Sequence, residues 1–121
     1  MSRIERAREL QDRTKKFALR IIGAFSRLPK TDEARVIGRQ FLRSGTSVAA
    51  NYRAACRARS TADFISKISI VVEEADETLF WLELVTEAKL VQPKIVESLV
   101  TECEELVKIF SASLATAKAN R

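Results

Sequence analysis

Four long stretches of the chain carry apolar residues at three- and four-residue steps, and only three short breaks separate them. This spacing is that of one face of an α-helix. It predicts helices over residues 3–27, 32–58, 61–89 and 93–118. Because the connections are so short, consecutive helices must run antiparallel. The sequence therefore predicts an all-α, up-down-up-down four-helix bundle that forms a single domain over residues 1–121.

The breaks have the chemistry of helix ends. Pro29 ends the first helix because proline disfavours helix in the residue before it. Thr31 or Asp32 is expected to cap the second helix, and Ser60 the third. Pro93 suits the first position of the fourth helix, where its missing amide has no partner to lose.

Helical periodicity also predicts what is buried. The core stripe of the third helix is expected to comprise Phe64, Ile65, Ile68, Val72, Ala75, Leu79 and Leu82. Gly38 and Gly45 fall near the core side of the second helix, where small residues let another helix approach closely. Cys56 and Cys103 have apolar helical spacing and are expected to be buried free thiols.

Little in the chain suggests chemistry. It has no histidine, the commonest general base near neutral pH and the commonest metal ligand. The hydroxyl-rich run from Ser44 to Ser47 lacks the spacing of a phosphate-binding loop, and the acidic run from Glu73 to Glu77 spreads around its helix. We therefore expect a non-enzyme without catalytic residues, metal or cofactor. Asn51, in the middle of a helix, is expected to hydrogen-bond across an interface.

No apolar run approaches the length of roughly 18 residues that suggests a membrane-spanning helix. The N-terminal segment is charged throughout and lacks the apolar centre of a signal peptide. The expected location is the cytoplasm, with no membrane partner.

The second helix carries an unusual row of cations, which we call the arginine stripe. Its members fall within an arc of about 80° opposite the apolar side, and no acidic residue lies between the first and the last. They are Arg35, Arg39, Arg43, Arg53 and Arg57. Arginine suits sites that grip phosphate or carboxylate through two parallel hydrogen bonds. The stripe could be a solvated face, a contact with an acidic protein or neighbouring subunit, or a site for RNA or DNA.

Charge divides between the halves of the chain. Residues 1–60 hold 15 Lys and Arg against 5 Asp and Glu, a net charge of +10. Residues 61–121 hold 6 against 11, a net charge of −5. A basic hairpin could attract a polyanion with strongly salt-dependent affinity. Alternatively, the basic half of one subunit could meet the acidic half of the next and close a ring.

The third helix has more apolar side chains than one core stripe needs. We call the surplus the apolar patch; it consists of Ile70, Phe80, Trp81 and Leu84. These side chains could wrap the edge of the core. We favour a subunit interface, because a helix that is apolar on two sides is usually buried on two sides, and aromatic residues are enriched at interfaces.

The segments from Gln40 to Ala55 and from Ser60 to Leu82 carry a specific resemblance. They read QFLRSGTSVAANYRAA and STADFISKISIVVEEADETLFWL. Both are similar to the signature of the 23S rRNA intervening-sequence proteins, a family also called four helix bundle proteins. Two departures stand out: Ala54 replaces the family's usual glutamate, and the approach to Ser60 is basic instead of acidic.

The resemblance implies a left-handed up-down bundle that assembles as a homopentamer around a central channel. It also implies no established catalytic activity. A related branch accompanies reverse transcriptases, where a basic ring engages protein and nucleic acid. We accordingly expect a homo-oligomer, with RNA, DNA or an acidic protein as further partners. The main alternative is a structural or protein-interaction scaffold whose basic face contacts an acidic neighbour.

Overall fold

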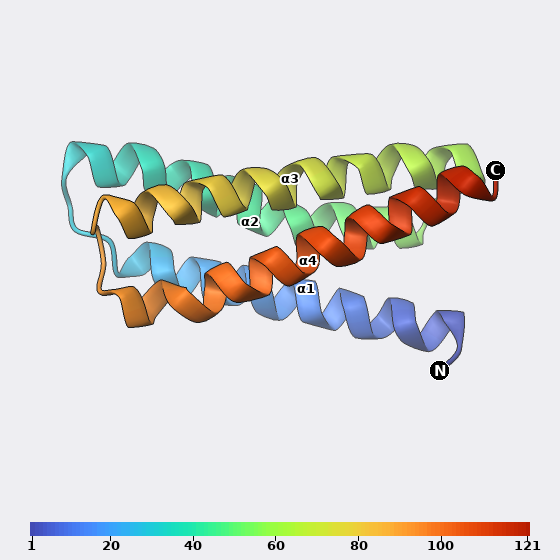
Figure 1. Ribbon diagram of the computed structural model, residues 1–121, viewed down its shortest axis with the longest axis horizontal. Helices are drawn as coiled ribbons and strands as arrows, with labels where there is room; N and C mark the ends of the chain where they lie inside the picture. The colour runs from blue at the N-terminus through green and yellow to red at the C-terminus, as the bar shows by residue number, and fades with distance from the viewer.

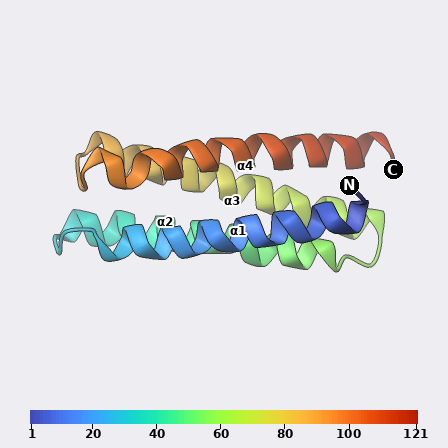
Figure 2. The same ribbon diagram turned by 90° about the horizontal axis from the view of Figure 1, so that it is seen from below.

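The computed structural model describes all 121 residues and contains four helices and no strand. α1 spans Arg3–Ser26, α2 Asp32–Cys56, α3 Thr61–Glu87 and α4 Pro93–Ala119. The helices run up, down, up and down (Figure 1). Figure 2 shows α1 and α2 along one side of the bundle and α4 along the other. The predicted fold class is confirmed, and every helix end lies within two residues of its predicted position.

The predicted helix starts are capped as their residue types require. Thr31 Oγ1 accepts the backbone amide of Ala34 at 3.3 Å, and Ser60 Oγ accepts that of Asp63 at 3.0 Å. Each bond satisfies one amide that has no partner inside the helix. Pro93 occupies the first turn of α4, whose cap residue makes no side-chain hydrogen bond.

All four helices contribute to one core of 18 buried hydrophobic residues. Its largest fully buried members include Phe17, Phe41, Leu82 and Phe110. The ring of Phe110 lies 4.9 Å from that of Tyr52, centroid to centroid, which joins the fourth helix to the second. Removal of such a side chain typically costs about 3–5 kcal/mol, because the cavity only partly collapses.

The core stripe of α3 differs from the prediction. Phe64, Ile65, Val72 and Leu79 are only half-buried. The buried residues are Ile68, Val71, Ala75, Thr78, Leu82 and Val85. They alternate at three- and four-residue steps, the pattern of a coiled-coil seam. The prediction is confirmed for Ile68, Ala75 and Leu82. It was wrong at the other positions, because one seam residue is a threonine and a search for apolar periodicity passes over it.

Two glycines bring α1 and α2 close together, as predicted. A Cβ atom on Gly45 would lie 2.8 Å from Cγ1 of Ile21, and one on Gly38 would lie 3.1 Å from Cε1 of Phe25. Both distances are shorter than ordinary van der Waals contact. The spacing between these helices therefore depends on residues without a side chain.

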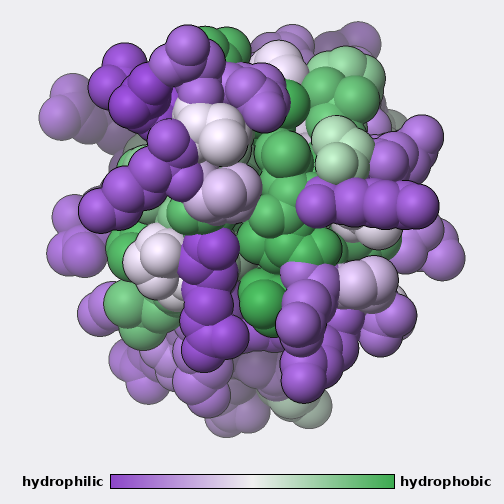
Figure 3. Space-filling view, turned by 90° about the vertical axis from the view of Figure 1, so that its left-hand side faces the viewer, coloured by the Kyte–Doolittle hydropathy of each residue, from purple (hydrophilic) through white to green (hydrophobic).

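The seam between α1 and α4 is the open side of the bundle. The two helices lie near each other at the end that holds the α1–α2 and α3–α4 turns, and they diverge towards the two chain termini (Figure 1). Arg13 bridges the seam through two hydrogen bonds of 2.7 Å to the carboxylate of Glu102. Figure 3 shows the end of the bundle that holds the α1–α2 and α3–α4 turns, where an apolar centre is surrounded by hydrophilic side chains.

Candidate nucleic-acid and assembly surfaces

The arginine stripe lies on the solvent-facing side of α2. All five of its members are exposed, whereas the opposite side of the helix buries residues such as Phe41, Val48 and Tyr52. The helix thus presents a basic face while its apolar face holds the core. This arrangement leaves guanidinium groups available to a ligand.

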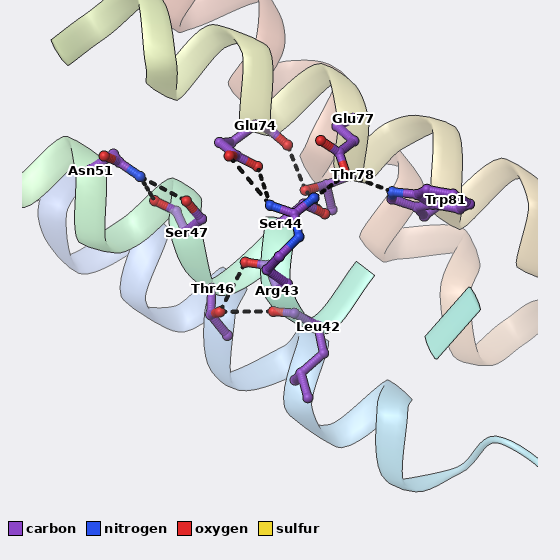
Figure 4. A network of polar contacts seen from close by, with 10 residues as sticks. All are labelled: Leu42, Arg43, Ser44, Thr46, Ser47, Asn51, Glu74, Glu77, Thr78 and Trp81. Carbon is purple, nitrogen blue, oxygen red and sulfur yellow. Dashed lines mark hydrogen bonds and ion pairs between the residues drawn. The ribbon is translucent and has the colours of Figure 1, made fainter. Parts of the chain in front are cut away.

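Two arginines of the stripe already contact carboxylates of the same chain. Arg43 Nη1 lies 3.4 and 3.3 Å from the two carboxylate oxygens of Glu74, and its Nη2 contacts Glu77 (Figure 4). Arg35 contacts Asp32 one turn earlier on α2. The periodicity of α2 alone gave no sign of the Arg43 contacts, because both acids belong to α3. Glu74 and Glu77 are three residues apart, which places them on one side of that helix.

The other three arginines have no such partner. No carboxylate oxygen lies within 4.0 Å of the guanidinium groups of Arg39, Arg53 or Arg57. We call these three residues the free arginines. Their positive charge is not neutralised by a direct ion pair within the chain, so the candidate polyanion site narrows to them.

Polar residues of α2 that face α3 are satisfied inside the bundle. The buried hydroxyls of Ser44 and Thr78 share a hydrogen bond of 2.9 Å, and Thr78 Oγ1 also donates to the carbonyl of Glu74 (Figure 4). Within the chain, Asn51 does not make the expected hydrogen bond to another helix. Its Nδ2 donates to the carbonyl and hydroxyl oxygens of Ser47 at 2.9 and 2.7 Å, one turn earlier on α2.

The apolar patch is divided between the core edge and the surface. Trp81 is half-buried against the core, and its Nε1 donates to Glu77 Oε2 at 2.9 Å. Leu84 is also half-buried. Ile70 and Phe80 are 39% and 51% exposed. The Phe80 ring lies 5.0 Å from that of Trp81 in an edge-to-face arrangement, so an aromatic pair that is only partly covered remains on α3.

Other exposed apolar side chains were missed by the sequence reasoning. Ile4, Leu19 and Ile22 lie on α1, and Val36 lies on the first turns of α2. A signal was present: Leu19 and Ile22 are three residues apart on the side of α1 away from Phe17 and Ile21. Apolar surface therefore extends beyond the patch.

Comparison with known proteins identifies the family. The family model described as 23S rRNA-intervening sequence protein matches residues 7–112. The chain belongs to this family. The match includes the whole of α2 and α3, so the arginine stripe and the apolar patch both lie on the part that family members share. No curated protein matches the chain.

A solved structure shows the same fold. It is a crystal structure of a protein with unknown function, from the S23 ribosomal protein family of Bacteroides thetaiotaomicron. This chain is 36% identical to it, with a TM-score of 0.79. The similarity covers 86% of this chain and 96% of that one. The bundle of this 23S rRNA-intervening sequence protein thus has an experimental counterpart.

The cysteines of this family member lie in different environments. Cys103 is buried and its Sγ lies 3.2 Å from the carbonyl of Ala75. Burial raises the pKa of the Cys103 thiol to about 12. Cys56 was expected to be buried but is exposed, because it is the last residue of α2. Partial burial still raises the pKa of the Cys56 thiol.

The side chains do not form a metal site. No group of three or more His, Cys, Asp or Glu residues is placed to hold an ion. None of the helices combines the length and the apolar character that a bilayer crossing requires.

Proposed function

We propose that the protein is a non-enzymatic, homopentameric bundle that binds RNA, or another nucleic acid, through its free arginines. The observation that carries the proposal is their position. Arg39, Arg53 and Arg57 lie exposed on one side of α2 with no carboxylate of the chain in contact. The location that we propose is the cytoplasm, where RNA is available to the protein.

Charge and geometry favour a phosphate backbone. The half of the chain that contains α1 and α2 carries a net charge of +10. A field of this sign raises the local concentration of polyanions and speeds their association. Guanidinium groups match phosphate oxygens through two parallel hydrogen bonds. Repetition of the free arginines around a ring would multiply these contacts.

The apolar patch supports assembly. Phe80 and Ile70 are too exposed to contribute fully to the core of one chain, and Glu77 holds the indole of Trp81 beside the Phe80 ring. Tryptophan is enriched among the few residues that contribute most of the binding energy at protein interfaces. The number of five subunits is what the resemblance to the family implies.

RNA binding is tested with a double charge reversal, Arg39→Glu with Arg53→Glu. The matched control is Lys108→Glu with Lys118→Glu, which changes the same charge on exposed residues of α4. Fluorescence anisotropy with a labelled structured RNA at two salt concentrations gives the affinity and its salt dependence. We expect the arginine variant to bind RNA more weakly, and the slope of log K against log salt to become shallower by about 0.7–0.9 for each phosphate that the variant no longer neutralises. Equal affinities for variant and control would refute the proposal.

A second candidate is a scaffold whose stripe contacts the acidic α3 of a neighbouring subunit or another acidic protein. The contacts of Arg43 with Glu74 and Glu77 favour it, since they show this pairing within one chain. Light scattering on the Arg39→Glu, Arg53→Glu variant separates the two candidates. Loss of assembly supports the scaffold, whereas loss of RNA affinity with assembly intact supports nucleic-acid binding.

The assembly surface is tested with Trp81→Asp and with Phe80→Asp, which alters a more exposed residue and so protects against a loss of folding. Ala62→Asp adds the same charge to an exposed position in the first turn of α3 and is the control. We expect both patch variants to reduce the mass measured by light scattering while circular dichroism stays helical. A wild-type mass equal to that of a single chain would refute assembly itself.

A further inference from the structure

A groove of about 530 Å³ lies between the last turns of α1 and the first turns of α4. Three of its nine lining residues are cations, namely Arg20, Arg27 and Lys94, and none is Asp or Glu. The groove belongs to a different helix pair from the arginine stripe, which lies on α2 alone. Neither the stripe nor the apolar patch accounts for it.

The cations of the groove have no acidic partner in the chain. No carboxylate oxygen lies within 4.0 Å of Arg20, Arg27 or Lys94. Arg20 Nη2 donates to Ser98 Oγ at 2.6 Å, which ties the guanidinium of α1 to α4 across the groove. A hydroxyl orients the group without neutralising it, so three positive charges from two helices face one hollow.

The first turn of α4 adds to this positive field. Gln92 precedes the helix and provides no side-chain cap, and Pro93 contributes no amide hydrogen. Lys94 follows directly, so its backbone amide is one of those that have no partner in the helix. The partial positive charge of a helix N-terminus favours bound anions.

Gly23 gives independent support for a ligand in the groove. It lines the groove, lies within α1, and has an ordinary negative φ angle. A Cβ atom there would meet nothing within 4 Å. Neither the backbone conformation nor the packing of the chain therefore requires glycine, although glycine weakens a helix relative to alanine. Its absence of a side chain keeps the groove open to a group that approaches the backbone.

We infer that this groove binds a phosphate group. Two arginines, a lysine and a helix N-terminus around one groove suit a multiply charged anion, and phosphate carries more charge than a single carboxylate. The phosphate could belong to a small phosphorylated solute or to a nucleic-acid backbone. In either case the contacts are made by α1 and α4, so the site is distinct from the free arginines of α2.

Pyrophosphate is the probe for the first source, measured by isothermal titration calorimetry at constant ionic strength. Three variants test the groove: Arg20→Gln, Arg27→Gln and Gly23→Leu. The last keeps the charge and fills the hollow. Lys118→Gln is the control for loss of one charge at an exposed position of α4. Each arginine variant should weaken pyrophosphate binding by about fivefold, the scale of one partly exposed charge contact. Gly23→Leu should weaken it by obstruction of the groove, and the control should leave it unchanged.

A short single-stranded RNA, measured by anisotropy with the same variants, is the second arm. If the groove variants weaken RNA binding and pyrophosphate does not bind, the phosphate is that of the backbone. If they weaken pyrophosphate binding alone, the ligand is a small solute. The inference is overturned if Gly23→Leu and both arginine variants bind both probes as the wild type does. Arg39→Glu with Arg53→Glu should leave pyrophosphate binding unchanged, which separates failure here from failure of the proposed function.

Discussion

Gly45 and Gly23 make a matched test of how α1 and α2 pack. Both are helical glycines, and replacement of a helical glycine by alanine is worth about 0.5–1 kcal/mol in favour of the folded state. At Gly23 a new Cβ meets nothing within 4 Å. Gly23→Ala should therefore raise the free energy of unfolding by about that amount. Alanine should stabilise the helix equally at Gly45, but there the new Cβ atom would clash with a neighbouring side chain.

The conflict at Gly45 comes from a stiff side chain. A new Cβ would lie 2.8, 2.9 and 3.0 Å from Cγ1, Cγ2 and Cδ1 of Ile21. Two of these atoms are attached to the branched Cβ of Ile21, so rotation of the side chain cannot clear all three. Overpacking of a dense core costs about 1–3 kcal/mol. The free energy of unfolding of Gly45→Ala should be lower than that of Gly23→Ala by about this amount. It should be lower than that of the wild type by up to about 2 kcal/mol.

Urea denaturation at one fixed protein concentration provides the assay, because assembly makes apparent stability depend on concentration. Ile21→Ala removes all three opposing atoms, so its combination with Gly45→Ala should cost less than the sum of the single changes. A coupling of about 0.5–3 kcal/mol is expected for residues in direct contact. The reasoning is refuted if Gly45→Ala stabilises the protein as much as Gly23→Ala, or if the double variant is simply additive.

Two further predictions concern buried polar groups. Thr78→Val should cost about 1–3 kcal/mol because it leaves the buried hydroxyl of Ser44 without its partner on α3; adding Ser44→Ala should recover part of the loss in the same denaturation assay, and no recovery would contradict this account. Iodoacetamide should modify the exposed Cys56 of the native protein and spare the buried Cys103, as peptide mass spectrometry will show. Since burial raises the pKa of Cys103 to about 12, its thiol stays protonated in the folded chain where the unfolded chain ionises. The free energy of unfolding should therefore fall as pH rises from the ordinary thiol range towards 12, and fall less in Cys103→Ala.

The local signals in the sequence were enough for the helices. Thr31, Ser60 and Pro93 stand at helix starts in the structure as expected, because capping depends on residues within one turn. Gly38 and Gly45 were likewise expected against another helix, and the structure places them against α1.

What the sequence did not predict depends on contacts between helices. The engagement of Arg43 by Glu74 and Glu77 requires the register of α2 against α3, which periodicity within one helix does not contain. The burial of Thr78 has the same origin, since its hydroxyl meets Ser44 of α2 as well as the carbonyl of Glu74 in its own helix. The groove between α1 and α4 joins residues more than 60 positions apart and had no sequence motif.

The divergence of α1 from α4 affects which parts of the bundle open locally. Every extensive packing surface joins helices that are consecutive in the chain. The α1–α2 hairpin can therefore pack on the α3–α4 hairpin without contact between α1 and α4. Amide hydrogens in the first turns of α1 and the last turns of α4 should consequently exchange with solvent sooner than those at the centre of α2 and α3. Any neighbour or ligand that ties these two ends together would slow that exchange without altering the core.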